Sequence, residues 1–239
     1  DSIANMQLRL PVVVIGGGLT AIDTATEALA YYPLQVEKFL QRYEILSAAK
    51  GEAIVREAWD AEEKEIADEF LSHARAIRAE RQAAQQERRT PGVINLLQSW
   101  GGATIAYRKR LIDSPSYTLN HEEVEKALEE GIWFAEGMTP VRVNVDAWGH
   151  TQSVRFAVQK RDETGQWQDT GEVELPARAL LVAAGTQPNT VLAREDDKQF
   201  KLNGRYFAAC DEEGNPVQPA YANPKPETPM VLLSRYKDS

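Results

Sequence analysis

Three consecutive glycines separate a short apolar run from a helical pattern, and their spacing is that of a phosphate-binding turn. Gly16, Gly18 and Ala21 fit the pattern Gly-x-Gly-x-x-Gly/Ala. The first glycine permits a tight bend, the second lets the backbone approach a pyrophosphate, and the third small residue lets the helix pack on the strand. N–H groups at the helix start and the helix dipole attract the phosphate charge. The segment Pro11–Asp23 is therefore predicted to bind NAD, NADP or FAD. A glycine-rich turn without a ligand is the alternative.

Three cations follow the next predicted strand, where Tyr107 leads into Arg108, Lys109 and Arg110. Proteins that bind NAD carry a carboxylate at this strand end, about 20 residues after the glycine turn, and it holds a ribose hydroxyl. Arginine instead binds phosphate through two parallel N–H···O hydrogen bonds from its guanidinium group. The cations favour NADP(H), with Arg108 and Arg110 on the 2′-phosphate; a solvated basic loop is the alternative.

The glycine turn needs a buried strand before it and a helix after it, and the sequence predicts both. Val12–Ile15 is continuously apolar and β-branched, as in a strand buried on both faces of a parallel sheet. From Leu19 onward apolar residues recur three and four positions apart. We expect this helix to end at Tyr31-Tyr32-Pro33, because proline interrupts a helix.

A charged block, residues 34 to about 90, is rich in Glu, Lys, Arg, Gln and Ala. Its apolar positions predict two or more amphipathic helices. A further helical stretch, Val93–Trp100, precedes the second strand at Ala103–Tyr107. The block is therefore interpreted as a helical insertion between the first helix and the second strand.

The second half of the chain completes the predicted fold. The expected elements are a loop at Ser114-Pro115, a helix at 120–130, strands at 132–135 and 179–184, and a β-meander at about 138–147, 152–160 and 171–175. This order predicts an α/β, Rossmann-like three-layer nucleotide-binding domain, with a parallel sheet, helices and a β-meander. We expect this NADP(H)-binding domain at 1–202, and an irregular, proline-rich segment at 203–239.

Composition limits the other classes of function. The 36 acidic and 27 basic side chains give a net charge of −9, which disfavours nucleic acid as a partner. The single cysteine excludes an internal disulfide and a multi-cysteine metal site. No apolar run reaches the roughly 20 residues of a membrane span, so we expect a cytoplasmic protein without membrane contact.

Other residues with chemical potential are interpreted as structural. His73, His121 and His150 are scattered along the sequence and are expected at the surface or in turns, so no metal site is predicted. Ser114 and Ser116 lack the Gly-x-Ser-x-Gly setting of a hydrolase nucleophile. No catalytic side chain is assigned.

Four segments in this order resemble the pyridine-nucleotide-binding part of flavoprotein oxidoreductases of the glutamate synthase small-subunit type, within the flavin-linked disulfide-reductase superfamily. The segments are VVVIGGGLTAID, GATIAYRKR, EVEKALEEGIWF and LLVAAGTQPNT. The resemblance covers roughly residues 11–31 and 100–192. It implies an NADPH-dependent oxidoreductase in which hydride passes from NADPH to FAD and the protein mainly positions the two rings.

By that resemblance, the nucleotide would contact three groups of residues. Gly16, Gly18 and Ala21 would hold the pyrophosphate, with Gly17 and Leu19 in the same cofactor-binding turn, and Thr20 and Asp23 would lie near the ribose or nicotinamide. Arg108 and Arg110 would contact the 2′-phosphate, with Lys109 between them in the cofactor-binding segment. The turn back toward a flavin domain would be formed by Ala184, Gly185, Thr186, Pro188 and Asn189.

The sequence departs from the family pattern in two ways, one that concerns FAD binding and one that concerns the helical insertion. The chain has one glycine fingerprint and lacks the family's C-terminal flavin-binding Gly-Asp segment, so FAD is expected only in a longer parent protein whose FAD domain flanks both ends. The family also does not require the insertion at 34–90, which could be a lid, a subunit contact or a decoration.

Two other classes of function remain as alternatives. One is an interaction module that binds no nucleotide and acts through the insertion. The other is a self-sufficient short-chain reductase, which would want a Tyr-x-x-x-Lys pair on a helix after the central strands, and that pair is absent there.

Overall fold

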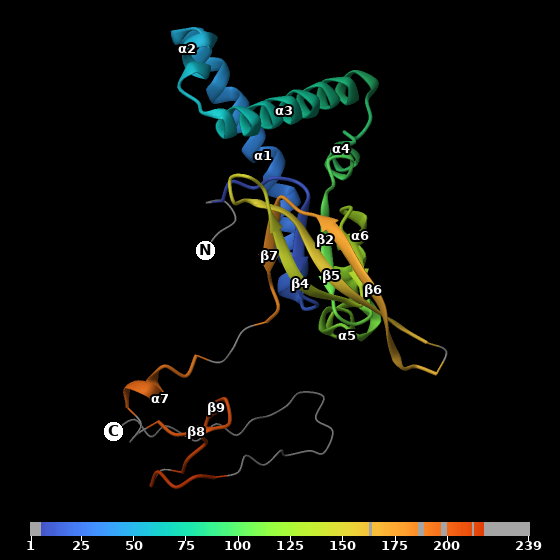
Figure 1. Cartoon of the computed structure of the whole chain (residues 1–239), viewed down its shortest axis with the longest axis vertical. Coiled ribbons are helices and arrows are strands. Elements are labelled where there is room, and N and C mark those ends of the chain that lie inside the picture. The colour runs from blue at the N-terminus through green and yellow to red at the C-terminus, as the bar shows by residue number, and fades with distance from the viewer. Residues whose placement is uncertain (1–5, 163, 186–188, 197–199, 212, 218–239) are drawn as a thin grey trace. The chain divides into compact units, whose positions relative to one another are not determined.

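The computed structural model describes residues 6–162, 164–185, 189–196, 200–211 and 213–217. Contacts divide the chain into two units, residues 1–185 and 186–239. The first unit contains the glycine turn, the cations and the helical insertion, and Figure 1 labels its helices and strands.

A four-stranded parallel sheet forms the centre of the first unit. Its strands are β1 (Val12–Ile15), β2 (Ala103–Tyr107), β3 (Trp133–Glu136) and β7 (Ala179–Val182), in the order β3-β2-β1-β7. All three strand pairs are parallel, so the carboxyl ends of the strands share one edge. The predicted α/β, Rossmann-like fold is confirmed.

The first helix does not end at the proline. α1 spans Leu19–Lys50 with Pro33 inside it, so the predicted break at Tyr31-Tyr32-Pro33 is wrong. Proline removes one backbone hydrogen bond and strains the preceding turn. In α1 the proline stands in a buried stripe that includes Tyr32, Val36 and Leu40, all fully buried. Burial of this stripe offsets the local cost of the proline.

The rest of the insertion packs against α1. It contains α2 (Glu52–Glu57) and α3 (Ala61–Glu87), followed by α4 (Val93–Ser99) before β2. Figure 1 shows α3 running across α1, and the two helices contact each other. Asp60 caps α3: its carboxylate accepts from the Glu63 N–H, and Glu63 accepts from the Asp60 N–H.

A buried arginine connects the insertion to the segment that leads into β1. The Arg9 side chain is 10% exposed, and its guanidinium contacts Glu69 and lies 3.1 Å from a Glu65 oxygen on α3. Glu65 also lies 3.3 Å from Arg178, whose N–H donates to the Pro11 carbonyl. Glu65 and Glu69 thus connect α3 by charge to the segments that precede β1 and β7.

Short helices occupy the connection between β2 and β3. A 3₁₀ turn, η2 (Leu111–Asp113), is followed by α5 (Pro115–Leu119) and α6 (His121–Glu129). The expected loop at Ser114-Pro115 is therefore a helix start: the Ser114 hydroxyl accepts the Tyr117 N–H, and proline occupies the first turn, where no backbone donor is needed.

The predicted β-meander is confirmed as an antiparallel sheet of β4 (Met138–Val145), β5 (Thr151–Arg161) and β6 (Trp167–Pro176). Val154 and Phe156 of β5 are fully buried and cluster with Val13 of β1 and Ala106 of β2. The meander therefore covers one face of the parallel sheet (Figure 1).

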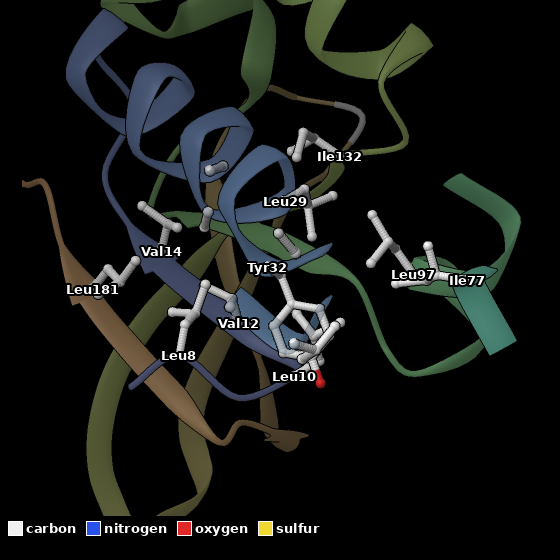
Figure 2. Packing of buried hydrophobic residues seen from close by; sticks show 14 of the residues in the cluster. Leu8, Leu10, Val12, Val14, Leu29, Tyr32, Ile77, Leu97, Ile132 and Leu181 are labelled. Atoms are coloured by element: carbon white, nitrogen blue, oxygen red, sulfur yellow. The ribbon is translucent and has the colours of Figure 1, made fainter. Parts of the chain in front are cut away.

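The larger core lies on the opposite face of the sheet. Figure 2 shows Val12 and Val14 of β1 packed with Leu29 and Tyr32 of α1. Ile77 of α3 and Leu97 of α4 belong to the same cluster. The insertion thus shares a continuous core with the sheet, which completes the helical layer.

The second unit contains little regular structure among its described residues. These form α7 (Leu192–Glu195) and a hairpin of β8 (Leu202–Asn203) and β9 (Tyr206–Phe207). Across both units, no helix that the structure describes is long and apolar enough to cross a membrane.

Candidate nucleotide-binding site

Gly16 lies where β1, β7 and α1 meet. Its N–H donates to the Ala106 carbonyl at 3.2 Å, and next to it the Ala183 N–H donates to the Ile15 carbonyl at 2.8 Å. A Cβ at Gly16 would overlap the Ala183 carbonyl and stand 2.9 Å from the Ala21 Cβ. The first glycine and the small third residue therefore allow the close approach of strand and helix that the fingerprint requires.

Gly17 is packed from one side. A Cβ there would overlap the ring of Tyr107, the last residue of β2. The Gly17 carbonyl accepts the Ser116 N–H at 3.2 Å and the Ser116 hydroxyl at 3.1 Å. Ser116 is buried and its hydroxyl lies 3.0 Å from that of Ser114. Ser116 thus supports the turn directly, and Ser114 contacts Ser116.

Gly18 is open. No atom lies within 4 Å of a Cβ built there, and Gly18 is the N-cap of α1 without a side-chain cap. No described residue accepts a hydrogen bond from the N–H groups of Gly17, Gly18, Leu19 or Thr20. The first turn of α1 also contains no acidic residue. The helix therefore presents free donors and its positive dipole end, the environment that stabilises a phosphate.

The cations after β2 lie at the same carboxyl edge of the sheet. Arg108 and Lys109 are exposed, and no described carboxylate lies within ion-pair distance of them. Arg110 forms a bidentate pair with Asp113, at 2.8 Å from Nε and 3.0 Å from a terminal nitrogen. No carboxylate was predicted beside these cations, but the 3₁₀ turn brings Asp113 to Arg110.

A second carboxylate reaches the strand end from β3. Glu136 stands opposite Tyr107 in the register of β2 and β3, and its carboxylate accepts the Leu111 N–H at 2.7 Å. Its charge contributes to the raised pKa of Arg110, of which the hydrogen bond to Asp113 is the main cause. The cations at the end of β2 thus lie near two carboxylates, Asp113 and Glu136, and each of these already accepts a hydrogen bond.

The remaining predicted residues lie around the turn. Asp23 and Thr20 are exposed on α1. Ala184 and Gly185 are exposed after β7, which pairs with β1. Thr186 and Pro188 lie outside the described residues.

One histidine differs from its expected surface position. His73 of α3 is half-buried, lies 2.6 Å from the Tyr32 hydroxyl and stacks on Trp100 at a 3.8 Å centroid distance. Apolar positions on α3 face α1, and the helical period places His73 beside them. Burial lowers the pKa of His73, with smaller opposing effects of Glu69 and Arg9. His121 and His150 are exposed, and no metal-binding group occurs in the part of the chain that the structure describes.

Comparison with known proteins identifies one long relative. No protein-family model matches the chain. An uncharacterized protein of Rickettsia prowazekii (strain Madrid E) is 42% identical over 228 residues, which cover 87% of this chain and 29% of that protein. The chain thus spans less than a third of the length of this curated relative.

Among solved structures, the chain is similar to a covalent putidaredoxin reductase–putidaredoxin complex. The sequence identity is 13%, the match covers 84% of this chain and 28% of that chain, and the TM-score is 0.38. A similarity of this size indicates no function.

Proposed function

We propose that the chain is the NADP(H)-binding domain of a flavin-dependent oxidoreductase. The observation that carries the proposal is the open helix start at Gly18, which lies at the same sheet edge as the cations Arg108 to Arg110. A dinucleotide pyrophosphate needs N–H donors at a helix start, and an adenosine 2′-phosphate needs cations at the end of the second strand.

The residues present suit NADP(H) better than NAD(H). The carboxylate nearest to the cations, Asp113, is bound by the Arg110 fork, and Glu136 accepts from a backbone N–H. Arg108 and Lys109 are exposed. Their positive charges attract a phosphate dianion. Neither side chain can accept a hydrogen bond from the hydroxyl groups of an unphosphorylated ribose, as binding of NAD(H) requires.

In the proposed enzyme, bound NADPH supplies a hydride for FAD held by another part of the same parent protein. This chain binds and orients the nucleotide, and none of its side chains is needed as a nucleophile or a general base. The proposed domain covers residues 1–202, and residues 203–239 lead back to the FAD domain. The relative's greater length is compatible with such a parent.

A second candidate function is an interaction module that binds no nucleotide. It is favoured by exposed apolar side chains on the insertion, where Ile45, Leu46 and Ile54 are 61%, 45% and 60% exposed. A partner protein would cover these side chains.

Calorimetric titration of the chain with NADPH separates the two candidates. The nucleotide-binding proposal predicts saturable binding to one site. Absence of saturable binding contradicts it and favours the interaction module. The control is the Gly18→Ala variant, which places a methyl group where the pyrophosphate is proposed to approach, in space that is open in the protein.

A further inference from the structure

A pocket beside the cations has no role in the nucleotide fingerprint. It lies between Arg110 and the hairpin that joins β5 to β6, and its lining includes Glu136, Lys160, Arg161 and Trp167. We call it the hairpin pocket. Its volume is about 530 Å³, which is within the range of small-molecule sites.

The enclosed cavity between the glycine turn and Tyr107 is too small for the adenosine end of a nucleotide. Tyr107, Ser114 and Ser116 fill it together with Phe134, and only about 10 Å³ remains. That is the space of about one water molecule. The hairpin pocket, by contrast, is large enough to take an adenosine that extends past the strand ends.

The backbone fixes the hairpin pocket against the cationic segment. The Gly137 N–H donates to the Lys109 carbonyl at 3.2 Å, and the Gln159 N–H donates to the Gly137 carbonyl at 2.9 Å. A Cβ at Gly137 would overlap the Gln159 carbonyl, and Gly137 has a φ of +69°, which favours glycine. Lys160 and Arg161 directly follow Gln159, which is hydrogen-bonded to Gly137, and Gly137 is in turn hydrogen-bonded to Lys109.

Two of the pocket's cations, Lys160 and Arg161, have no described ion partner, and its carboxylates accept hydrogen bonds from neighbouring groups. No described carboxylate lies within ion-pair distance of Lys160 or Arg161. The Asp162 carboxylate accepts hydrogen bonds from the Thr164 hydroxyl and the Gln168 side-chain amide, and from the N–H groups of Thr164 and Gln166. These bonds, the side-chain ones first, lower the pKa of Asp162 to about 2. A phosphate entering the pocket therefore meets two cations that have no described ion partner, while the Asp162 carboxylate stays charged but is held by its own donors within the hairpin.

The pocket also offers an aromatic surface. The Arg161 guanidinium lies 5.6 Å from the centre of the Trp167 ring. A cation over an aromatic ring places a positive charge and a flat apolar surface on the same side of the pocket. A purine is a suitable stacking partner for indole.

We propose that the hairpin pocket receives the adenosine 2′-phosphate end of NADP(H), with Lys160 and Arg161 binding the phosphate and Trp167 contacting the purine. This inference rests on the proposed function and extends it to a second element, since Lys160 and Arg161 come from β5 and act in addition to the cations at the β2 end. It makes the β5–β6 hairpin a determinant of nucleotide choice.

The test uses Arg161→Ala and Lys160→Ala in the full chain, with Arg142→Ala as the matched control because Arg142 is an exposed cation elsewhere on the meander. Calorimetry with NADPH and NADH is combined with adenosine 2′,5′-bisphosphate and AMP, which differ only in the 2′-phosphate. Thermal unfolding verifies that each variant is folded.

We expect Arg161→Ala to weaken NADPH and adenosine 2′,5′-bisphosphate by about tenfold or more, a loss typical of one charge-assisted contact. NADH and AMP should change by less than about twofold, as should all four ligands in Arg142→Ala. The bisphosphate should also quench tryptophan emission in the wild type and not in Trp167→Phe.

Two results overturn the inference and differ in their meaning. If the wild type binds NADPH and the Lys160→Ala and folded Arg161→Ala variants bind the bisphosphate normally, the hairpin pocket is not the phosphate site and the proposed function stands. If the wild type binds neither dinucleotide, the proposed function fails together with the inference.

Discussion

The guanidinium of Arg110 is held by the carboxylate of Asp113 through two hydrogen bonds of 2.8 and 3.0 Å. The pair lowers the pKa of Asp113, chiefly through the Arg110 hydrogen bonds, and the charges of Arg161 and Lys109 act in the same direction. An internal anion therefore already sits among the cations proposed for the 2′-phosphate. A ligand phosphate must displace this carboxylate or bind beside it.

Replacing Asp113 with asparagine should strengthen NADPH binding. The amide keeps the shape and removes the charge that competes with the phosphate, so we expect NADPH to bind about 3–10-fold more tightly. NADH lacks the phosphate and should be unaffected. Parallel calorimetric titrations measure both. Weaker NADPH binding, or equal changes for the two nucleotides, contradicts a competing role for Asp113.

Two glycines of the turn should respond differently to alanine. Gly16→Ala forces a methyl group into the Ala183 carbonyl, so we expect a loss of about 2 kcal/mol or more in the free energy of unfolding. Gly18→Ala meets open space and should leave stability within about 0.5 kcal/mol of the wild type. Urea unfolding without nucleotide makes this comparison.

Gly18→Ala should nevertheless impair ligand binding. The pyrophosphate is common to both nucleotides, so NADPH and NADH should weaken by similar factors, of about tenfold or more. A Gly18→Ala variant that is stable and binds both nucleotides normally contradicts the placement of the pyrophosphate at this helix start.

His73 should make stability depend on pH. Burial lowers its pKa, so the unfolded chain binds a proton at higher pH than the folded chain. The free energy of unfolding should therefore fall as pH decreases from about 6.5, the ordinary value, through the lowered pKa. His73→Gln should flatten this part of the profile in urea unfolding from pH 8 to about pH 5. An identical slope in the variant excludes His73 as the cause.

Arg9 should stabilise the attachment of the insertion more than a surface ion pair does. Arg9→Met leaves Glu69, which is 21% exposed, without its partner, and we expect a loss of about 1–3 kcal/mol. Arg78→Met breaks a pair in which both side chains are nearly half exposed, and it should cost less than about 1 kcal/mol. Equal losses in denaturant unfolding would show that burial of Arg9 is unimportant.

Local sequence patterns predicted most of the sheet because its strands are short and apolar. β1 and β2 have the predicted bounds, and β7 ends two residues earlier than expected. The break at Pro33 was wrong because the buried stripe around it depends on packing against α3, which no local pattern reveals.

The candidate site was only partly predictable for a similar reason. Gly16 and Gly18 follow from a local motif. Asp113 reaches Arg110 only through a 3₁₀ turn, and Glu136 reaches Tyr107 only through the register of two strands. Arg161 lies far along the chain and comes near the β2 end through the pairing of Gly137 with Gln159.

The most direct test of the account is the ratio of the NADH and NADPH dissociation constants, measured by calorimetry for the wild type and for Arg108→Ala. We expect a wild-type preference for NADPH of about a hundredfold or more, because several charge-assisted contacts act on the 2′-phosphate, and a drop in that ratio of about tenfold in Arg108→Ala. A wild-type preference for NADH, or a ratio unchanged in the variant, contradicts it.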